Sequence, residues 1–267
     1  MSVEIIEFCN LKISRLILGG NPFSGFSHQS PQKDQEMVHY FTTARIKQTL
    51  KQAERVGITT FLGRADRHII RVLLEYWDGG GTLQWIAQTC PELCSIERAI
   101  DDAIAIGAKA IFIHGGQMDY MMANDQLSEI PKAIDRIRDA RLPAGIAGHT
   151  TNVFQWAEEA LDVDFYMCSY YNPCSHLQSA EGDIVPHETF SPDDRDKMVS
   201  LIQHLSKPVI HYKVMAAGRN EPHAALEFVA KHLRAQDAVC IGSFPKNHPD
   251  MLLENAKIFS QNLITAR

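Results

Sequence analysis

The chain has 267 residues, of which 45% are hydrophobic and 22% charged. This is the composition of an ordinary globular protein with a large core, and it excludes a disordered or fibrous chain. Lysine and arginine number 26 against 32 aspartates and glutamates, which gives a formal charge of -6, and no basic run is present. We therefore expect no nucleic-acid partner.

The sequence carries no signal for a membrane. No apolar stretch reaches the roughly 18 residues that a span needs, and the start, Met-Ser-Val-Glu-Ile-Ile-Glu, is acidic where a signal peptide is basic. We predict a cytoplasmic protein with no membrane partner. Scattered cysteines are typical of reduced thiols in that setting, and we expect no disulfides among them. They are Cys9, Cys90, Cys94, Cys168, Cys174 and Cys240.

The predicted elements begin with a short hairpin and continue as a repeat. The first 13 residues alternate weakly between apolar and polar around Cys9 and Asn10, which predicts a β-hairpin. Beyond it, an apolar strand, a turn signal and a helix follow one another repeatedly. The predicted strands cover residues 16–19, 59–63, 83–88, 110–114, 144–148, 164–169, 209–214 and 238–242. The predicted helices lie near residues 44–56, 67–77, 95–106, 126–140, 152–161, 192–205, 221–234 and 248–263.

Eight strands alternating with eight helices indicate an α/β fold, a single (β/α)8 TIM barrel with an N-terminal hairpin. We expect residues 1–267 to form one domain, because no low-complexity linker interrupts the repeat. An open doubly wound sheet is the competing fold. It would carry a G-x-G-x-x-G turn after an early strand, and no such motif occurs.

In a barrel the reacting groups lie where the strands run into the loops that follow them. Polar side chains at or just after the predicted strand ends are therefore the candidates for a functional site. In chain order they are Asn21, Arg64, Asp66, Gln88, His114, His149, Tyr171, Asn172, His211, Lys213, Ser243 and Lys246.

Two of the strands predict a shared pocket. Alternation puts His114 on the same face as Phe112, and it puts His211 and Lys213 on one face with Val209. If both faces point into the barrel, two imidazoles and an ammonium converge there. For His211, which lies deeper in its strand, a hydrogen-bonded structural role is an equal alternative.

The order of these segments resembles the aldo/keto reductase superfamily, from the hairpin to the last helix. The resemblance implies a barrel whose bottom is plugged by the hairpin. The segments that carry it are residues 13–19, 57–61, 110–115, 145–149, 164–173, 212–218 and 241–255.

The resemblance also implies a reaction and shows where this chain departs from it. The family reduces carbonyls with NADPH, using a tyrosine as proton donor, a lysine and an aspartate that help it, and a histidine that orients the carbonyl. His114 matches the histidine. Leu62 stands at the aspartate position, Arg67 at the tyrosine position, and the lysine position falls near Gln88 or Thr89.

The positions that hold the cofactor in this family are altered in parallel. Ala147-Gly148 stands where a Ser-Asn pair holds the nicotinamide amide, and neither residue offers a side-chain hydrogen bond. By resemblance, Tyr212 keeps the place of the aromatic that stacks on nicotinamide. Hydride transfer by the family's route is not expected, although NADP stays an option. Three further residues could still bind a phosphate of that cofactor, namely Ser243, Lys246 and Asn255.

Our first hypothesis is a non-redox enzyme, a lyase, isomerase or epimerase. It abstracts a proton from a small hydroxylated or carbonyl-bearing substrate such as a sugar derivative. His114 and His149 act as acid and base, or bind a divalent metal with Asp66, and the sequence leaves both open. Arg64 and Lys213 hold an anionic group or stabilise an enolate, with Lys213 as a Schiff-base nucleophile in a narrower version. The expected substrate-binding residues are Asn21, Gln88, Tyr171, Asn172 and His211.

Two other classes stay open. One is an NADPH-dependent aldo/keto reductase whose proton donor is rearranged to Tyr170 or Tyr171. The other is a small-molecule binding protein, which we disfavour because unpaired charges are costly in a closed pocket. A homo-oligomer is one option for the assembly. The polar segment 173–190 is expected to be an active-site lid or a subunit contact, with the lid preferred.

Overall fold

The computed structural model describes residues 3–172 and 190–266. Within these residues, none of the helices is long and apolar enough to cross a membrane. The described part of the chain contains five free thiols. They belong to Cys9, Cys90, Cys94, Cys168 and Cys240.

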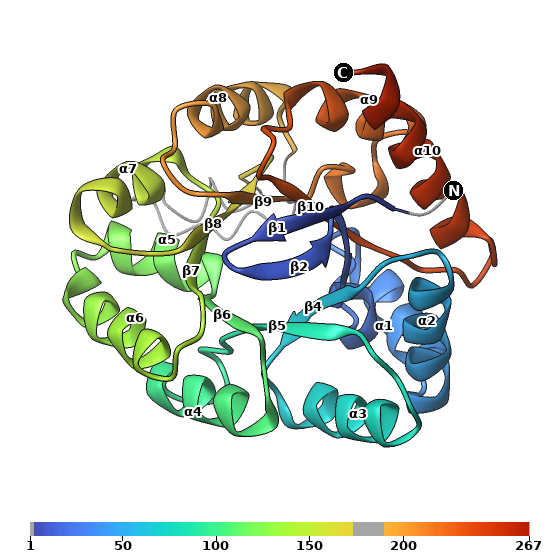
Figure 1. The fold of residues 1–267 in the computed structure, drawn as a ribbon, viewed down its shortest axis with the longest axis horizontal. Coiled ribbons are helices and arrows are strands. Elements are labelled where there is room, and N and C mark those ends of the chain that lie inside the picture. Colours follow the sequence, from blue (N-terminus) through green and yellow to red (C-terminus); the bar gives the residue numbers. More distant parts are fainter. Residues whose placement is uncertain (1–2, 173–189, 267) are drawn as a thin grey trace.

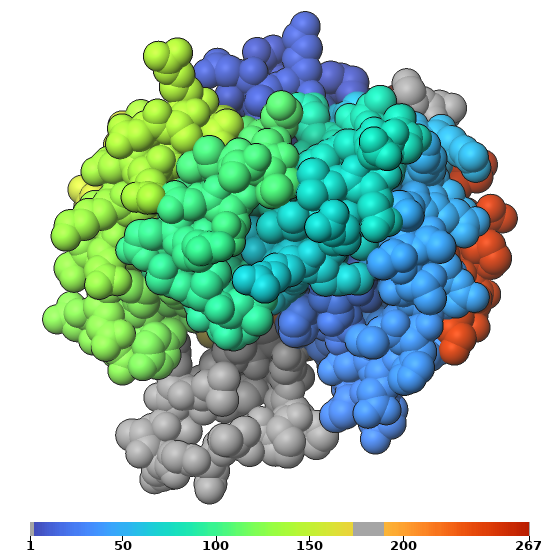
Figure 2. Space-filling view, turned by 90° about the horizontal axis from the view of Figure 1, so that it is seen from below, coloured from blue at the N-terminus to red at the C-terminus, as the bar shows by residue number. Residues whose placement is uncertain are grey.

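The N-terminal hairpin consists of β1 (Ile5–Phe8) and β2 (Leu11–Ser14), which pair antiparallel. Cys9 and Asn10 link them with φ of 49° and 66°, the left-handed pair that a tight hairpin turn requires. The hairpin lies across the middle of the barrel in Figure 1 and caps one end of it in the side view of Figure 2. Apolar side chains of both strands pack against interior residues of the barrel, so the hairpin closes this end.

Eight strands form a closed barrel in which all neighbours are parallel and the order follows the chain, with the last strand beside the first. The predicted (β/α)8 barrel with an N-terminal hairpin is confirmed. The strands are β3 (Leu16–Gly19), β4 (Thr60–Arg64), β5 (Gln84–Gln88), β6 (Ala110–Ile113), β7 (Ala144–Gly148), β8 (Phe165–Ser169), β9 (Val209–Tyr212) and β10 (Ala238–Gly242).

Helices surround this barrel (Figure 1). They are α1 (Pro31–Tyr40), α2 (Thr43–Arg55), α3 (Arg67–Asp78), α4 (Ile96–Ile106), α5 (Gly115–Ala123), α6 (Ile130–Asp139), α7 (Thr151–Ala160), α8 (Pro192–Ile202), α9 (Pro222–His232) and α10 (Met251–Thr265), with short 3-10 helices η1 (Asn21–Ser24), η2 (Leu127–Glu129) and η4 (Ala216–Gly218).

Two of these helices, α1 and α5, were not expected from the sequence. At the start of α1 the Ser30 side chain accepts a capping hydrogen bond, and Pro31 occupies the first helical position. This start signal could have been found in the sequence. α5 begins with Gly115 and Gly116, and each glycine costs about 1 kcal/mol of helix stability relative to alanine. The buried Met118 anchors α5, so tertiary packing outweighs the poor helix propensity of its first turn.

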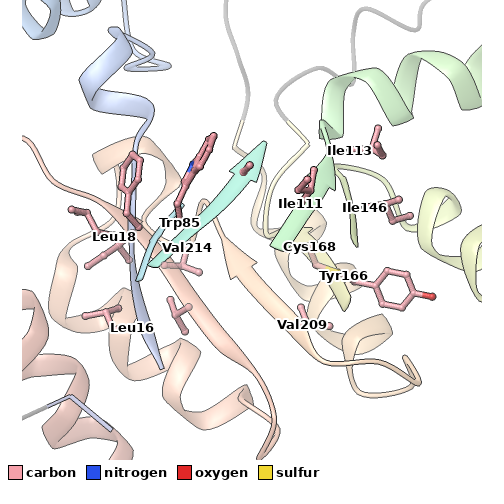
Figure 3. Close-up of a cluster of buried hydrophobic side chains, with 14 of the residues drawn as sticks. Leu16, Leu18, Trp85, Ile111, Ile113, Ile146, Tyr166, Cys168, Val209 and Val214 are labelled. Atoms are coloured by element: carbon pink, nitrogen blue, oxygen red, sulfur yellow. The ribbon is translucent and has the colours of Figure 1, made fainter. Parts of the chain in front are cut away.

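Alternate residues of the strands face two different apolar clusters. The inward cluster contains Ile17, Leu62, Ile86, Phe112, Ala147, Met167, Ile210 and Cys240. The outward cluster, much of which is labelled in Figure 3, contains Leu16, Leu18, Ile111, Ile113, Ile146, Tyr166, Cys168 and Val209. Because side chains alternate along a strand, these clusters show which polar residues at the strand ends point into the barrel.

Two strands end earlier than predicted. β6 stops at Ile113, because His114 is already the N-cap of α5. β9 stops at Tyr212 instead of residue 214, because Lys213 has a left-handed φ of 55°. This conformation costs a lysine about 1 kcal/mol or more and turns the chain away from the strand direction.

Candidate active site

His114 lies at the carboxyl end of β6, on the inward face that Phe112 shares. Its backbone N–H donates to Oγ1 of Thr89 at 3.0 Å. Burial, followed by the neighbouring charge of His149, lowers the pKa of His114 to about 4, so the ring is neutral near neutral pH. Its Nδ1 is buried and has no hydrogen-bond partner among the described residues. A neutral ring with an unsatisfied nitrogen is suited to binding a polar substrate atom.

His149 follows β7 and is bound to α5 through Asp119. Its Nδ1 lies 2.7 Å from Oδ2 of Asp119, and its backbone N–H donates to both carboxylate oxygens at 3.2 Å. Because an ionised carboxylate only accepts, Nδ1 carries the hydrogen and Nε2 of the neutral ring is an acceptor. Burial lowers the pKa of His149, and the hydrogen bond to Asp119 opposes this shift. The carboxylate therefore selects one tautomer of the ring.

Tyr212, the last residue of β9, brings a phenol to the same imidazole. Its hydroxyl lies 3.1 Å from Nε2 of His149 and 3.2 Å from the carbonyl oxygen of Gly148. Since Nε2 and the carbonyl oxygen both accept, the hydroxyl donates its single hydrogen between these two acceptors. A Cβ atom at Gly115 would lie 3.0 Å from this hydroxyl, so the first turn of α5 packs against the contact. We call Asp119, His149 and Tyr212 the mouth chain.

Lys213 lies beside the mouth chain, on a loop that contacts the segment after η1. Its Nζ is 3.3 Å from Nε2 of His28, and Nδ2 of Asn21 is 3.5 Å from the same nitrogen. The charge of Lys213 adds to burial in lowering the pKa values of His114 and His149. Four predicted site residues, His114, His149, Lys213 and Asn21, thus come together at the carboxyl end of the barrel.

Arg64 and Asp66 follow β4, but they bind each other and a neighbouring acid. Nε of Arg64 donates to Oδ2 of Asp66 at 2.9 Å, and Nη2 of Arg64 pairs with Glu92. The guanidinium also overlies the ring of Phe26, with 4.9 Å to its centroid. Oδ1 of Asp66 accepts from the backbone N–H of Ile69 and caps α3. Both charges therefore have partners inside the protein, and their predicted contact with a substrate stays a prediction.

The predicted metal ligands do not form a ligand set. In residues 3–172 and 190–266, no three His, Cys, Asp or Glu side chains gather in an arrangement that could hold a metal. His149 uses its two ring nitrogens on Asp119 and Tyr212, while Asp66 binds Arg64. The described residues thus give no ligand geometry to His114, His149 and Asp66, and a metal at this place stays a prediction.

His211 faces away from the mouth. Val209 belongs to the outward cluster (Figure 3), and His211, two residues further on, is fully buried between the barrel and the helices. Its Nε2 lies 3.2 Å from Oδ2 of Asp237, and its Nδ1 lies 3.0 Å from the hydroxyl of Tyr170. Of the two roles left open for His211, these contacts match the hydrogen-bonded structural one, and Tyr212 occupies the inward face instead. We call Asp237, His211 and Tyr170 the wall chain.

Arg234 binds the carboxylate of the wall chain and supplies its counter-charge. Its Nε and Nη2 each donate to Asp237 at 2.9 Å, and the backbone N–H of Val209 donates to Oδ1 at 2.9 Å. Burial works to raise the pKa of Asp237, but the hydrogen bonds from His211 and Arg234 hold it below its ordinary value. Burial and the charge of Asp237 raise the pKa of Tyr170 well above its ordinary value. The Tyr170 hydroxyl is buried against His211, on the side of β9 away from the other candidate residues, so it does not suit the role of proton donor to a substrate.

The other predicted substrate-binding residues lie around the mouth without joining its chain of hydrogen bonds. Gln88 is half-buried at the end of β5. Tyr171 is buried, and its hydroxyl accepts from Nδ2 of Asn220 at 2.8 Å. Asn172 is half-buried, and its backbone N–H donates to Asp194 at 3.4 Å. None of these bonds involves the mouth chain, so their contact with a substrate stays a prediction.

The predicted cofactor residues after β10 lie close to α1 and η1. Nζ of Lys246 pairs with Oε1 of Glu36 at 2.8 Å. Ser243 and Asn255 are buried, and Oγ of Ser243 has no hydrogen-bond partner within the described ranges. A Cβ atom at Gly242 would lie 2.9 Å from an atom of η1, so η1 covers the end of β10.

Asp119 is the residue that the sequence reasoning missed. It lies inside α5 and is buried, whereas the predicted catalytic and substrate-binding candidates were taken from strands and the residues just after them. The spacing of Met118, Met121 and Met122 was the available signal, because it is typical of one face of a helix. The segment 173–190, predicted as a lid, lies outside the described residues except for Phe190.

No model of a known protein family and no curated protein matches this sequence. Solved structures match over nearly the whole chain. A Pseudomonas aeruginosa protein provisionally assigned as an aldo-keto reductase has a TM-score of 0.62 at 15% identity, covering 96% of this chain and 92% of that one. A truncated 3-deoxy-D-arabino-heptulosonate 7-phosphate synthase from Thermotoga maritima has a TM-score of 0.57 at 13% identity, covering 99% of this chain and 92% of that one.

At such identities the likeness shows the fold alone. The fold is the (β/α)8 barrel that these enzymes use. The predicted resemblance to the aldo/keto reductases is confirmed at this level, including the N-terminal hairpin. The chemistry of the chain has to be argued from its own site, because one barrel supports many reactions.

Proposed function

We propose that this protein is an enzyme that moves protons to and from a small hydroxylated or carbonyl-bearing substrate, as a lyase, isomerase or epimerase. The mouth chain carries the proposal: a carboxylate, an imidazole and a phenol hydrogen-bonded in series. It lies at the carboxyl end of the strands, where (β/α)8 enzymes hold their active sites. A phenol that can pass its proton to an imidazole can act as an acid or a base.

His114 and Lys213 complete the proposed site. The pKa of His114 is lowered to about 4 by burial, so its neutral ring can hydrogen-bond to a carbonyl or hydroxyl oxygen without adding charge. Lys213 supplies a positive charge beside the two mouth imidazoles and stabilises the negative oxygen of an enolate. Tyr212 exchanges the proton with the substrate carbon.

An NADPH-dependent reductase is the second candidate, favoured by the fold and by a phenol beside a lysine at the mouth. The residues at the cofactor end do not fit a dinucleotide held in that family's way. Glu36 already neutralises Lys246 at 2.8 Å, and Ala147 and Gly148 offer no side-chain hydrogen bond to a nicotinamide amide. We therefore rank the non-redox reaction first.

Hydrogen exchange at carbon tests the proposal with simple probe compounds in place of the natural substrate. The protein is incubated in deuterium oxide with short aldoses, ketoses and 2-hydroxy acids, and NMR follows deuterium beside the carbonyl or hydroxyl carbon. We expect incorporation with at least one compound. Tyr212→Phe should lower its rate by about 100-fold or more, the usual contribution of a positioned acid or base.

Tyr170→Phe is the matched control, because it removes the same oxygen from the wall chain and should leave the exchange rate unchanged. NADPH-dependent reduction of a carbonyl probe without exchange would replace the proposal by the reductase. Saturable binding of a probe with neither exchange nor reduction would make the protein a binding protein.

A further inference from the structure

Asp119 is the buried acid that joins α5 to the end of β7. Its side chain is 9% exposed, and Oδ2 lies 2.7 Å from Nδ1 of His149. The backbone N–H of His149 donates to both oxygens at 3.2 Å, and the hydroxyl of Thr150 donates to Oδ1 at 3.3 Å. These contacts fix the orientation of the carboxylate and aim one oxygen at the imidazole.

We propose that Asp119 is a positioning residue: it holds His149 as the Nδ1–H tautomer, so that Nε2 receives the proton that Tyr212 gives up when it acts as the base. This inference rests on the proposed proton-transfer function and deepens it, because it names the residue that prepares His149 to take the proton of Tyr212. The other tautomer would present an N–H to the Tyr212 hydroxyl and could not take its proton. A carboxylate needs a donor on Nδ1, and it therefore disfavours that tautomer.

The proposed steps conserve protons and charge. The O–H bond of Tyr212 breaks, and its proton joins the lone pair of Nε2 of His149. The imidazolium that forms lies between the phenolate and the carboxylate of Asp119, which stabilises it. The phenolate then takes a proton from the substrate carbon, whose bonding pair passes into an enolate. Return of a proton from Tyr212 to the product carbon, and of the Nε2 proton to Tyr212, restores the starting state.

Other groups at the carboxyl end of the barrel surround this chain of hydrogen bonds. Lys213 lies on the adjoining loop, with His28 3.3 Å from its Nζ, and His114 faces the same space as a neutral ring. The first turn of α5 packs on the hydroxyl at Gly115, and the N-terminus of a helix stabilises nearby negative charge. The N-terminus of α5 is therefore suited to stabilise a negative charge on the Tyr212 oxygen.

Asp119→Asn removes the positioning and leaves the phenol and the imidazole in place. The hydroxyl of Thr150 and the backbone N–H of His149 still need an acceptor, so the amide oxygen takes the place of Oδ1. The amide NH2 group then faces Nδ1 of His149. The ring has to accept there and carry its hydrogen on Nε2, the tautomer that cannot receive the Tyr212 proton.

Nitrogen NMR of the imidazole rings tests the inference on the ligand-free protein. With the His149 signals assigned by comparison with His149→Gln, we expect the Nδ1–H tautomer in the wild type and the Nε2–H tautomer in Asp119→Asn. His211 is an internal reference with the opposite arrangement, since its Nε2 faces Asp237, and its Nε2–H tautomer should not change. Asp119→Asn should also lower the deuterium exchange rate by about 100-fold.

The outcomes separate this inference from the proposed function. An Nε2–H tautomer of His149 in the wild type overturns the inference, even if Asp119→Asn does not fold. An unchanged tautomer, or full exchange activity in Asp119→Asn, also overturns it. A third outcome is that the tautomer of His149 differs between wild type and Asp119→Asn as expected, while the wild-type protein exchanges deuterium into none of the probes. That result supports the positioning role of Asp119 and counts against the proposed function.

Discussion

The mouth chain and the wall chain contain the same three kinds of group, a carboxylate, an imidazole and a phenol. Neighbouring residues of β9 supply one group to each, with His211 in the wall and Tyr212 at the mouth. In the wall chain, Arg234 also binds the carboxylate, and the acid and imidazole have 0% exposed side chains. Counter-charge and burial, and not residue type, therefore separate the structural wall chain from the chain to which we assign proton transfer.

The wall carboxylate should give the largest effect on stability. Asp237→Asn leaves the charge of Arg234 without its anion in a buried network, and breaking such a pair costs about 3–5 kcal/mol. Asp119→Asn should cost clearly less, because in the described residues its carboxylate accepts from His149 and Thr150 and pairs with no guanidinium. Urea unfolding of both variants measures the difference, and equal losses would contradict the distinction between the two chains.

The two phenols should separate activity from stability. Tyr212→Phe is expected to lower the exchange rate by about 100-fold, which is about 3 kcal/mol of barrier. Tyr170→Phe should keep that rate and instead lose about 1 kcal/mol of unfolding free energy, the net value of one hydrogen bond. Exchange rates and urea midpoints of both variants check this. A low exchange rate in Tyr170→Phe would contradict this assignment, because it would place the reaction on the outward side of β9.

Acid should lower the free energy of unfolding through the buried imidazole of His114. Its pKa is about 4 when folded against an ordinary 6.5, so between these pH values the unfolded chain binds a proton that the folded ring does not. The contribution is fully present above pH 6.5, and up to about 3 kcal/mol is lost as pH falls through this window. Urea unfolding at several pH values should show a flatter profile for His114→Gln. The exposed His204→Ala should follow the wild type.

Alanine substitutions of the two glycines at the start of α5 should give the smallest effect on stability. They test how closely this helix packs against the mouth chain. Gly115→Ala places a Cβ 3.0 Å from the Tyr212 hydroxyl, whereas Gly116→Ala places one 3.1 Å from Cε1 of His114. Stability should change by less than about 1 kcal/mol, because alanine is the better helix former. Only Gly115→Ala should shift the Nε2 NMR signal of His149. An unchanged signal would show that α5 does not constrain that hydrogen bond.

Much of the barrel could be predicted because its signals are local. The apolar runs at residues 110–114 and 144–148 form β6 and β7 as expected. His114 and His149 follow these strands at the carboxyl end of the barrel. On β9, however, every apolar residue is buried on one side or the other. Hydrophobic pattern alone could not tell which side was inward, and it therefore left the role of His211 open.

The sequence by itself determined the hairpin, the repeat of strands and helices, and the edge of the barrel where polar groups collect, since these depend on the period of the chain and on its turns. Only the tertiary structure decided that Tyr212 points inward while His211 points out, and that Asp119 of α5 reaches His149. The left-handed backbone conformation of Lys213 ends β9, and α5, which begins with two glycines, places Asp119 beside His149. Both are held by contacts between segments distant in the chain, which no local pattern records.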